Sequence, residues 1–534
     1  MAEEWASFGR DLHLPIDRTR GLRAGLEHAL REAVRDGRLG PGDQLPSSRS
    51  LAQELGISRG TVTQVYEQLT AEGYLDSRPR STVRVAPRTK PPAPLPTQPP
   101  LPAQTSLPAQ TSLPAQTSFP AQPPLPRRPP FSAQASLPAR PPFPAEPAGC
   151  LPVTGGFDLR PGLPDLSMFP RREWLAATRH VLQTAPNTAF AYGAPAGTTE
   201  LREALADYLG RSRGVITSPA NIVICAGYTH ALRVICEALT GPIAFEHPCL
   251  PDYPALAATM GLPVSHIPVD NDGLVVSDLG QENAVVVTPA HQYPLGVTLS
   301  PHRRLQLIDW SRRTGAVIVE DDYDGEFRYD RQPVGALQGL APDHVIYAGT
   351  VSKTIAPALR IAWLAVPTSV LPAVHRVLTS DESHVSTLDQ LILAHLIRRG
   401  DLDRHLRRCR TRYRHRRDHL GRAIATHLPG AHLSGIAAGL HAVLHLPGAT
   451  EPDILTALQN ADVAVEALSF FYRRADHGHR ADHGRRADHG RRADREPSHG
   501  ASPGVVIGYA SPPQHAYDSA VEALITALRS AIAT

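Results

Sequence analysis

The sequence has little of several features that mark common protein classes. Its five cysteines are odd in number and scattered, with no Cys-x-x-Cys pair, which argues against a disulfide framework or a zinc module and fits a reducing compartment. No apolar run approaches the roughly 18 residues that a membrane span requires. The N-terminus lacks a basic stretch followed by an apolar one, so we expect no secretory signal and a cytoplasmic protein.

Lysine is nearly absent. Of the 54 basic residues only two are lysines, Lys90 and Lys353, and the other 52 are arginines. Because 51 acidic residues nearly balance them, the formal net charge is only +3 and the chain as a whole is not a polyelectrolyte. With 534 residues, of which 42% are hydrophobic, the chain is long enough for two or three domains and a sizeable core.

Proline, in contrast, is abundant, and 20 of the 53 prolines lie between Pro91 and Pro147. Residues 101–148 repeat with a period of six, beginning LPAQTS. Such proline density blocks helices and sheet ladders, and one Leu or Phe per repeat cannot build a core. We therefore predict a disordered, polyproline II-biased linker over 91–150, with a docking site for an SH3-like partner as the alternative.

A second repetitive tract runs from Arg474 to Arg492, again with a period of six (RADHGR). Its histidines raise the alternative of a metal site. Glycine and charge dominate the tract, however, and nothing apolar anchors it. We predict a solvated insertion at about 473–503 and no metal site. The two tracts divide the chain into a head (1–90, core 14–87) and a body (151–534).

The head has the pattern of three helices followed by two short strands. Helices are predicted from Leu22 to Gly37, from Arg49 to Leu55 behind a serine cap, and from Ser58 to about Glu72. The last two, joined by a tight turn, match a helix-turn-helix, and the segment YLDSRPRSTVRVAP matches a basic wing. The alternative from spacing alone is a three-helix bundle with charged faces.

The stretch LPSSRSLAQELGISRGTVTQVYEQLTAEGYLDSR closely resembles the winged helix-turn-helix head of GntR-type bacterial regulators. In those regulators the residues matching Arg49, Ser58, Arg59 and Thr61 touch the operator, and we add four further candidates: Thr63, Gln64, Arg78 and Arg80. The wing turn departs from the family, because Pro79-Arg80-Ser81-Thr82 stands where Gly-Ser-Gly-Thr is usual. Contacts from the helix are therefore better supported than contacts from the wing.

The body alternates β-branched runs with helical patterns. Short buried strands are predicted at 222–227, 284–289, 316–321, 344–349 and 361–366, and an amphipathic helix at 302–315. This alternation predicts an α/β fold with a mainly parallel sheet.

Lys353 lies between two of these strands. Arginine stays protonated and cannot form a Schiff base, whereas a desolvated lysine amine can. A lysine retained in an arginine-rich chain is what an aldehyde cofactor requires, although a surface lysine by chance is the alternative. In VIVEDDYDGEF, carboxylates follow a strand end, and Asp321 could pair with a pyridinium nitrogen, with Tyr323 on the same side. A solvated acidic loop is the other reading.

A third segment, AGYTHALRVI, follows a strand and opens a helix. The amides of Gly227, Tyr228 and Thr229 could therefore hold a phosphate at a helix N-terminus. A plain strand-to-helix turn is the alternative.

Together with GLPDLSMFP, TPAHQYPLG and SKTIAPALR, these segments resemble the fold type I aminotransferase-like body of MocR-type regulators, which carry a GntR head. The resemblance implies a seven-stranded-type sheet, a smaller C-terminal subdomain, a homodimer and pyridoxal 5'-phosphate bound as an aldimine to Lys353. It further implies Asp321 at the ring nitrogen and Tyr293 and Tyr323 near the phenolic oxygen. The phosphate is expected to meet Tyr228, Thr229, Thr350 and Arg360, and Tyr192 of the partner subunit.

Two departures bear on function. Leu250 stands where the family often has a ring-stacking aromatic, and Val506 where amino-acid-handling relatives carry a carboxylate-binding arginine. A missing arginine removes the charge-assisted bonds that orient an amino acid. We therefore predict a transcription regulator that responds to pyridoxal phosphate rather than an enzyme, with genes of vitamin B6 or amino-acid metabolism as possible targets. An active aminotransferase with a DNA-binding head and a cofactor-free dimerisation scaffold are the alternatives.

Overall fold

The computed structural model describes residues 21–35, 39–55, 57–76, 83–86, 156–329, 335–381, 384–473 and 504–533. The head consists of α1 (Leu22–Arg35), α2 (Ser48–Leu55), α3 (Arg59–Ala71), β1 (Leu75–Asp76) and β2 (Arg84–Val85). The two strands pair antiparallel, as in a wing. The helices and strands expected of a winged helix-turn-helix are thus confirmed.

Capping serines and a small apolar core define the head. The Ser47 hydroxyl accepts the amide of Ser50 at 3.1 Å, and the Ser58 hydroxyl accepts the amide of Thr61 at the same distance. The residues at 0% exposure in the three helices are Leu26, Leu30, Ala33, Leu51, Val62, Val65 and Leu69. Burying each of these Leu and Val side chains contributes roughly 1.5–3 kcal/mol, so the apolar stripes fix how the helices pack.

The body is built on an eight-stranded sheet in the order β4-β11-β10-β9-β8-β5-β6-β7. The strands are β4 (Ile222–Cys225), β5 (Ile243–His247), β6 (Val264–Asp270), β7 (Gly273–Leu274), β8 (Ala284–Val287), β9 (Val317–Asp322), β10 (Val345–Thr350) and β11 (Ala362–Ala365). Neighbours from β10 through β6 run parallel, whereas β11 is antiparallel to both β10 and β4. The prediction of a mainly parallel sheet is confirmed.

Helices cover both faces of this sheet. They are α4 (Arg171–Thr184), α5 (Thr199–Ser212), α6 (Tyr228–Ala238), α7 (Asp252–Thr259), α8 (Pro301–Thr314), α9 (Leu371–Ser380), α10 (Thr387–Arg398) and α11 (Asp401–His427). Val223 packs with α6 and α9 on one face, while its neighbour Ile224 packs with α5 and α10 on the other. Successive residues of a strand point to opposite faces, so a strand covered on both sides must be apolar throughout.

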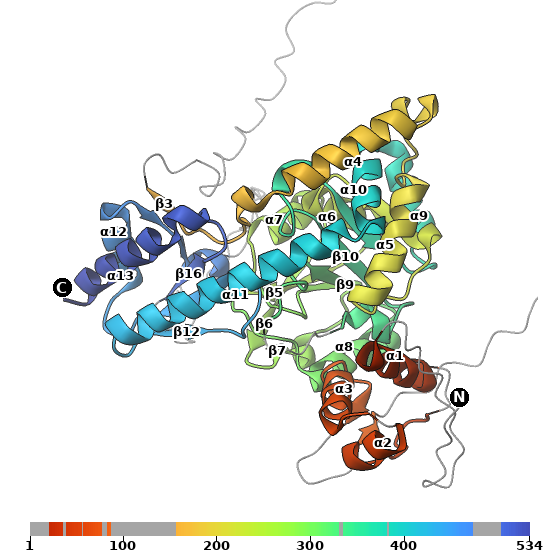
Figure 1. Ribbon diagram of the computed structural model, residues 1–534, viewed down its shortest axis with the longest axis horizontal. Helices are drawn as coiled ribbons and strands as arrows, with labels where there is room; N and C mark the ends of the chain where they lie inside the picture. The colour runs from red at the N-terminus through yellow and green to blue at the C-terminus, as the bar shows by residue number, and fades with distance from the viewer. Residues whose placement is uncertain are drawn as a thin grey trace, which may run out of the picture. The chain divides into compact units, whose positions relative to one another are not determined.

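The C-terminal part forms a smaller unit around an antiparallel sheet in the order β12-β13-β16-β15. Its elements are β12 (His432–Ser434), β13 (His441–His445), α12 (Glu451–Asn460), β14 (Val463–Ala464), β15 (Glu466–Ala467), β16 (Gly504–Gly508) and α13 (Tyr517–Ala533). The strand β3 (Phe157–Asp158) reaches this unit and pairs with β14. Helix α11 runs from the large sheet to this unit (Figure 1). The smaller C-terminal subdomain is thus present.

Three predictions fall outside the described residues: the linker at 91–150, the insertion at about 473–503, and the wing turn with Arg78 and Arg80. They stay predictions, as do the domain boundaries that depend on them. Among the helices that the structure describes, none is long and apolar enough to cross a bilayer.

Candidate functional site

Lys353 lies in the loop after β10, where its side chain is partly enclosed. Its Nζ donates a hydrogen bond to the carbonyl oxygen of Gly162 at 2.5 Å. Gly162 has φ +98°, and a Cβ there would lie 3.4 Å from Nζ, so glycine suits this position. Burial lowers the pKa of Lys353, against the opposing effect of Asp321 and Asp324. An amine with a lowered pKa is neutral more often at neutral pH and is the better nucleophile.

Asp321 lies near the end of β9, beside Ala348 of β10. Its side chain is buried, and burial raises its pKa well above the usual value, although Tyr228 and Lys353 favour the ionised form. The ring of Tyr228 packs against that of Tyr253 at 5.0 Å between centroids. A buried carboxyl group with a raised pKa is suited to a cationic ring nitrogen, which would stabilise its ionised form.

The N-terminus of α6 and Arg360 form a small cradle. Gly227 has φ +89°, and a Cβ there would lie 2.8 Å from the guanidinium carbon of Arg360. Arg360 itself has φ +50° and donates from Nη2 to the carbonyl oxygen of Ala226 at 2.8 Å. The amide of Gly227 already donates to Cys225 at 2.9 Å, so the amides of Tyr228 and Thr229 remain for an anion.

Thr350 is the last residue of β10, at the same edge of the sheet as the end of β4, which precedes α6. Its hydroxyl donates to the carbonyl oxygen of Ile361 at 3.1 Å and accepts the amide of Ser352 at 3.1 Å. Its hydroxyl also bonds that of Ser352 at 3.0 Å. Ser352, which sequence reasoning passed over, is therefore a further polar group beside Lys353.

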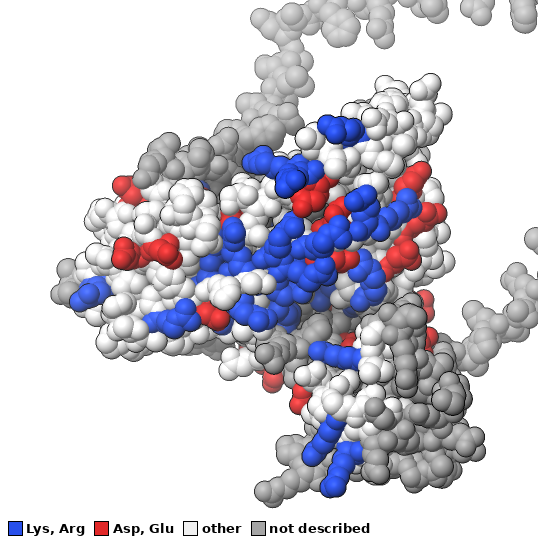
Figure 2. Space-filling model, in the orientation of Figure 1, with Lys and Arg blue, Asp and Glu red and all other residues white. Residues whose placement is uncertain are grey.

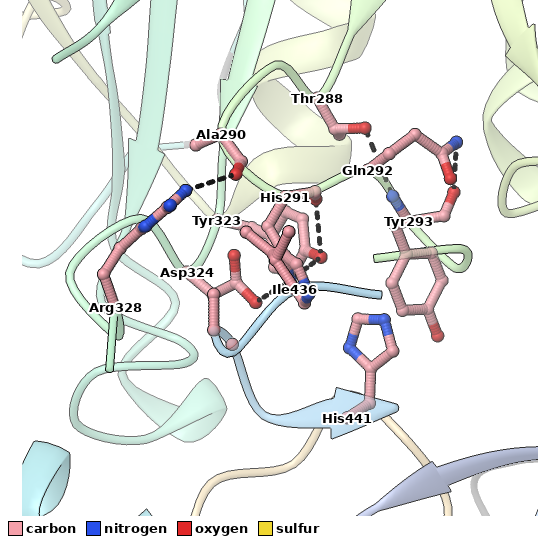
Figure 3. A network of polar contacts seen from close by, with 12 residues as sticks. Thr288, Ala290, His291, Gln292, Tyr293, Tyr323, Asp324, Arg328, Ile436 and His441 are labelled. Carbon is pink, nitrogen blue, oxygen red and sulfur yellow. Dashed lines mark hydrogen bonds and ion pairs between the residues drawn. The ribbon is translucent and has the colours of Figure 1, made fainter. Parts of the chain in front are cut away.

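Tyr293 and Tyr323 lie together in a polar network (Figure 3). Their rings meet edge to face at 5.8 Å, and the Tyr323 hydroxyl donates to the carbonyl oxygen of His291 at 3.0 Å. Tyr293 also packs edge to face on His441 at 5.0 Å. The two predicted tyrosines thus lie together, although the hydroxyl of Tyr323 already donates its hydrogen bond to the backbone carbonyl of His291.

His291, Asp324 and His441 form a buried cluster in this network (Figure 3). His291 Nδ1 lies 2.9 Å from Asp324 Oδ2, and His441 Nε2 lies 3.1 Å from the carbonyl oxygen of Pro294. One potential ligand atom from each lies within 4.8 Å of the others, a spacing that could hold a metal ion. Burial, with His291 nearby, lowers the pKa of His441 well below its usual value, which favours the neutral imidazole. The hydrogen bonds account for the cluster without an ion.

Sequence reasoning missed His291, Asp324 and His441. The first two lie in quoted motifs, TPAHQYPLG and EDDYDGEF, but their meeting with β13 depends on the fold. The two departures also lie here. Val506 is fully buried in β16, and Leu250 packs with Tyr293 and Leu295 in the same apolar cluster.

Tyr192 lies apart from these groups within one chain. It is fully exposed, beside a groove of about 460 Å³ between α4, α5 and α10. Other large apolar side chains exposed in the body include Leu175, Leu182 and Phe190. Large exposed apolar side chains are candidates for an interface.

The residues present fit pyridoxal phosphate. The chain supplies a lysine amine with a lowered pKa and a buried carboxylate in electrostatic contact with it. It also supplies an arginine-backed cradle at a helix N-terminus, where any side chain larger than glycine would intrude. An aldehyde, a pyridinium nitrogen and a phosphate are the chemical groups that match these three features.

In the head, Arg49, Ser58 and Arg59 are exposed at the N-termini of α2 and α3. Arg59 Nε donates to the Ser48 hydroxyl at 3.4 Å. Thr61 and Thr63 are half-buried. Gln64 is exposed but accepts from Arg23 Nη1 at 3.4 Å, so its side chain leans toward α1. The residues best placed to enter a groove of DNA are therefore the exposed ones at the two helix starts.

We expect Arg59→Ala to weaken operator binding by about 1–3 kcal/mol, roughly 5- to 150-fold, because an exposed arginine at the start of a recognition helix is lost. Fluorescence anisotropy with DNA from the protein's own upstream region measures this. Arg233→Ala, at an exposed position of α6, serves as the control. Equal affinities of the Arg59 variant and the unchanged protein would contradict the assignment.

Two family profiles match the chain. "Bacterial regulatory proteins, gntR family" covers residues 22–85, and "Aminotransferase class I and II" covers residues 163–479. The first match coincides with the head and the second spans the large sheet, α11 and much of the smaller unit.

The chain is similar to HTH-type regulators and, in its body, to a solved aminotransferase. The pyridoxine biosynthesis regulator PdxR of Corynebacterium glutamicum is 32% identical over 85% of this chain and 90% of its own length. The probable rhizopine catabolism regulatory protein MocR of Rhizobium meliloti is 30% identical over 88% of this chain and 90% of its own. Among solved structures, an archaeal alanine:glyoxylate aminotransferase superimposes with a TM-score of 0.60 at 25% identity, covering 70% of this chain and 91% of that one.

Proposed function

This chain belongs to the MocR/PdxR group of HTH-type transcriptional regulators, with a GntR head and an aminotransferase class I and II body, and from this we propose that pyridoxal phosphate controls its affinity for DNA. The cofactor would be held by a covalent bond to Lys353. The observation that carries this proposal is the partly enclosed Lys353 amine, which bonds the Gly162 carbonyl oxygen and interacts electrostatically with the buried Asp321.

Bound pyridoxal phosphate supplies an aldehyde carbon for a lysine amine and a ring that accepts electrons. In this chain Lys353 is the candidate for the covalent bond, and Asp321 for the ring nitrogen. Arg360 with Thr229, Tyr228 and Thr350 would bind the phosphate. Tyr293 and Tyr323 would border the ring, and Gly227 leaves the space that the phosphate needs.

The pocket favours the cofactor over an amino acid as the signal. Val506 offers no charge to a substrate carboxylate. A carboxylate brought beside this residue would lose its hydration without gaining an ion pair there. An active aminotransferase, which must orient an amino acid, is therefore the less favoured candidate.

The named function of one relative suggests the target genes. PdxR of Corynebacterium glutamicum is a regulator of pyridoxine biosynthesis. A regulator that binds the end product of vitamin B6 supply is suited to the same task, and we extend that role to this chain. Since it acts on DNA, we place it in the cytoplasm.

We further propose a homodimer in which Tyr192 of each subunit reaches the other's phosphate site. Support comes from the full exposure of Tyr192 and from Leu175 and Leu182 of α4, which are 61% and 54% exposed. Leu175→Glu with Leu182→Glu is expected to halve the mass measured by light scattering, because charges replace apolar contacts in the interface. Ile532→Glu, on α13, is the control and should leave the mass unchanged. A single-chain mass for the unchanged protein would contradict the dimer.

The proposal is tested by a DNA titration on the protein's own upstream region, with cofactor-free and cofactor-loaded protein side by side. A change in affinity or footprint on loading supports a cofactor sensor. Tight binding that is the same in both states would show that the body is a scaffold or responds to another ligand. Release of a keto acid from an added amino acid would favour the aminotransferase instead.

A further inference from the structure

We infer that the exposed side of helix α11 binds the phosphate backbone of DNA beyond the base pairs that the head reads. This inference rests on DNA binding by the head and adds a second contact surface, in the body. The surface consists of the exposed arginines of α11, namely Arg404, Arg407, Arg408, Arg414 and Arg422. We call it the α11 surface.

The α11 surface has an unusual charge for one helix. Its 27 residues hold nine arginines and three aspartates, a net formal charge of +6, whereas the whole chain has only +3. The helix thus concentrates more positive charge than the protein has overall. In Figure 2 basic side chains form a continuous band along α11, with acidic groups mostly at its margins.

A groove accompanies this band. It has a volume of about 840 Å³ and lies between α11 and the start of α13. The basic residues lining it are Arg404, Arg407, Arg408, Arg412, His415, Arg416 and His419. Asp518 is the acidic residue in its lining, and it pairs with His419 at 3.2 Å. A concave surface lined mainly by positive charge attracts anions.

The arginines of the groove differ in whether a carboxylate already neutralises them. Arg412 and Arg416 bind Asp165 at 3.2 and 2.9 Å. Arg404 pairs with Asp401, and Arg408 reaches Glu173 at 3.3 Å.

Within the described part of the chain, by contrast, Arg407 of the groove makes neither an ion pair nor a side-chain hydrogen bond, and the same holds for Arg414, which lies on the same helix outside the groove lining. Both are exposed and lie seven residues apart, which places them on the same side of the helix. They are free to meet phosphates.

The length of the helix favours a long polyanion over a small one. At 1.5 Å per residue, 27 residues extend about 40 Å, somewhat more than one turn of B-DNA. The protein already holds DNA through its head. A second basic surface on the same molecule would therefore act at a high effective concentration. The apolar face with Tyr192, proposed for dimerisation, shares no lining residue with this groove.

The test compares the full-length protein with its Arg407→Gln/Arg414→Gln variant on two duplexes from the upstream region. One duplex contains only the footprint of the head, and the other extends several helical turns beyond it. Gln keeps helix propensity while removing the charge. On the long duplex we expect the plot of log affinity against log salt to become shallower, its negative slope losing about 2 in magnitude. Binding at physiological salt should be about 10- to 30-fold weaker. On the short duplex we expect no change.

Arg233→Gln/Arg376→Gln is the matched control, since both arginines are exposed, on α6 and α9, and the same charge is removed. An unchanged salt slope of the α11 variant on the long duplex would overturn the inference, as would an equal effect of the control. If the Arg407→Gln/Arg414→Gln variant binds phosphatidylserine vesicles more weakly than the unsubstituted protein does but binds DNA equally well, the inference is overturned in favour of a lipid surface. An unchanged protein that binds neither duplex would overturn operator recognition itself, and the inference with it.

Discussion

Lys353→Ala is expected to abolish retention of pyridoxal phosphate through gel filtration and to make DNA affinity indifferent to added cofactor. The physical reason is that no second lysine is described near the site. The amine of Lys353 is also set apart by burial, which lowers its pKa. Reduction with borohydride followed by intact-mass measurement gives a readout that does not depend on DNA. The unchanged protein should gain the mass of one cofactor per chain, and the variant none.

Lys353→Arg is the control for charge. Arginine keeps a cation beside Asp321 but cannot form the covalent bond, because it stays protonated. Both variants should therefore fail to take up cofactor covalently, while operator binding without cofactor stays as in the unchanged protein. Covalent cofactor on either variant would place the bond elsewhere, with Lys90 as the other lysine in the chain.

Asp322→Asn is expected to lower the free energy of unfolding by about 3–5 kcal/mol, because it leaves the charge of Arg213 buried without its anion. Arg213 Nε lies 2.6 Å from Asp322 Oδ2, and the two side chains are 2% and 1% exposed. Tyr347 donates to the same carboxylate oxygen at 2.8 Å. Asn keeps the size of the side chain, so the loss reports on charge rather than on a cavity.

Urea unfolding followed by circular dichroism measures this loss as a lower midpoint. Asp309→Asn breaks the pair between Arg313 and Asp309 on α8, where the side chains are 67% and 47% exposed. Since exposed pairs of this kind contribute about 0.3–0.5 kcal/mol, the control should barely move the midpoint. Equal shifts for the two variants would mean that the buried pair contributes no more than a surface one.

Much of the fold was predictable because its signals are local. The second and third head helices begin at serines whose hydroxyls cap them, Ser47 and Ser58. The five strands predicted in the body are runs of β-branched residues long enough to be covered on both faces. The helix at 302–315 is present as α8, Pro301–Thr314.

Other elements were missed because their sequences are less regular. Strand β6 is half-exposed and contains Ser265, His266 and Pro268, so its pattern resembles a loop. The antiparallel place of β11 between β10 and β4 depends on pairing between segments far apart in sequence. No local periodicity contains that information.

The same distinction applies to the candidate site. Lys353 and Asp321 were predictable because each stands at a strand end in a distinctive local sequence. His291, Asp324 and His441 come from three separate elements, and only the folded chain brings their side chains within hydrogen-bonding range. The sequence also could not predict that the Gly227 amide donates to the Cys225 carbonyl oxygen, because this hydrogen bond depends on the backbone conformation at one residue.

The segment between Gly162 and Asp165 connects the site around Lys353 with helix α11. At one end its carbonyl accepts the Lys353 amine, and three residues later its carboxylate orients Arg412 and Arg416 of α11. If the Lys353 amine bonds a cofactor, its hydrogen bond to the Gly162 carbonyl weakens. A shift of this segment would also move Asp165 and so change how far Arg412 and Arg416 are neutralised. We therefore expect the cofactor to change the number of counterions released when DNA binds, and not only the affinity at one salt concentration.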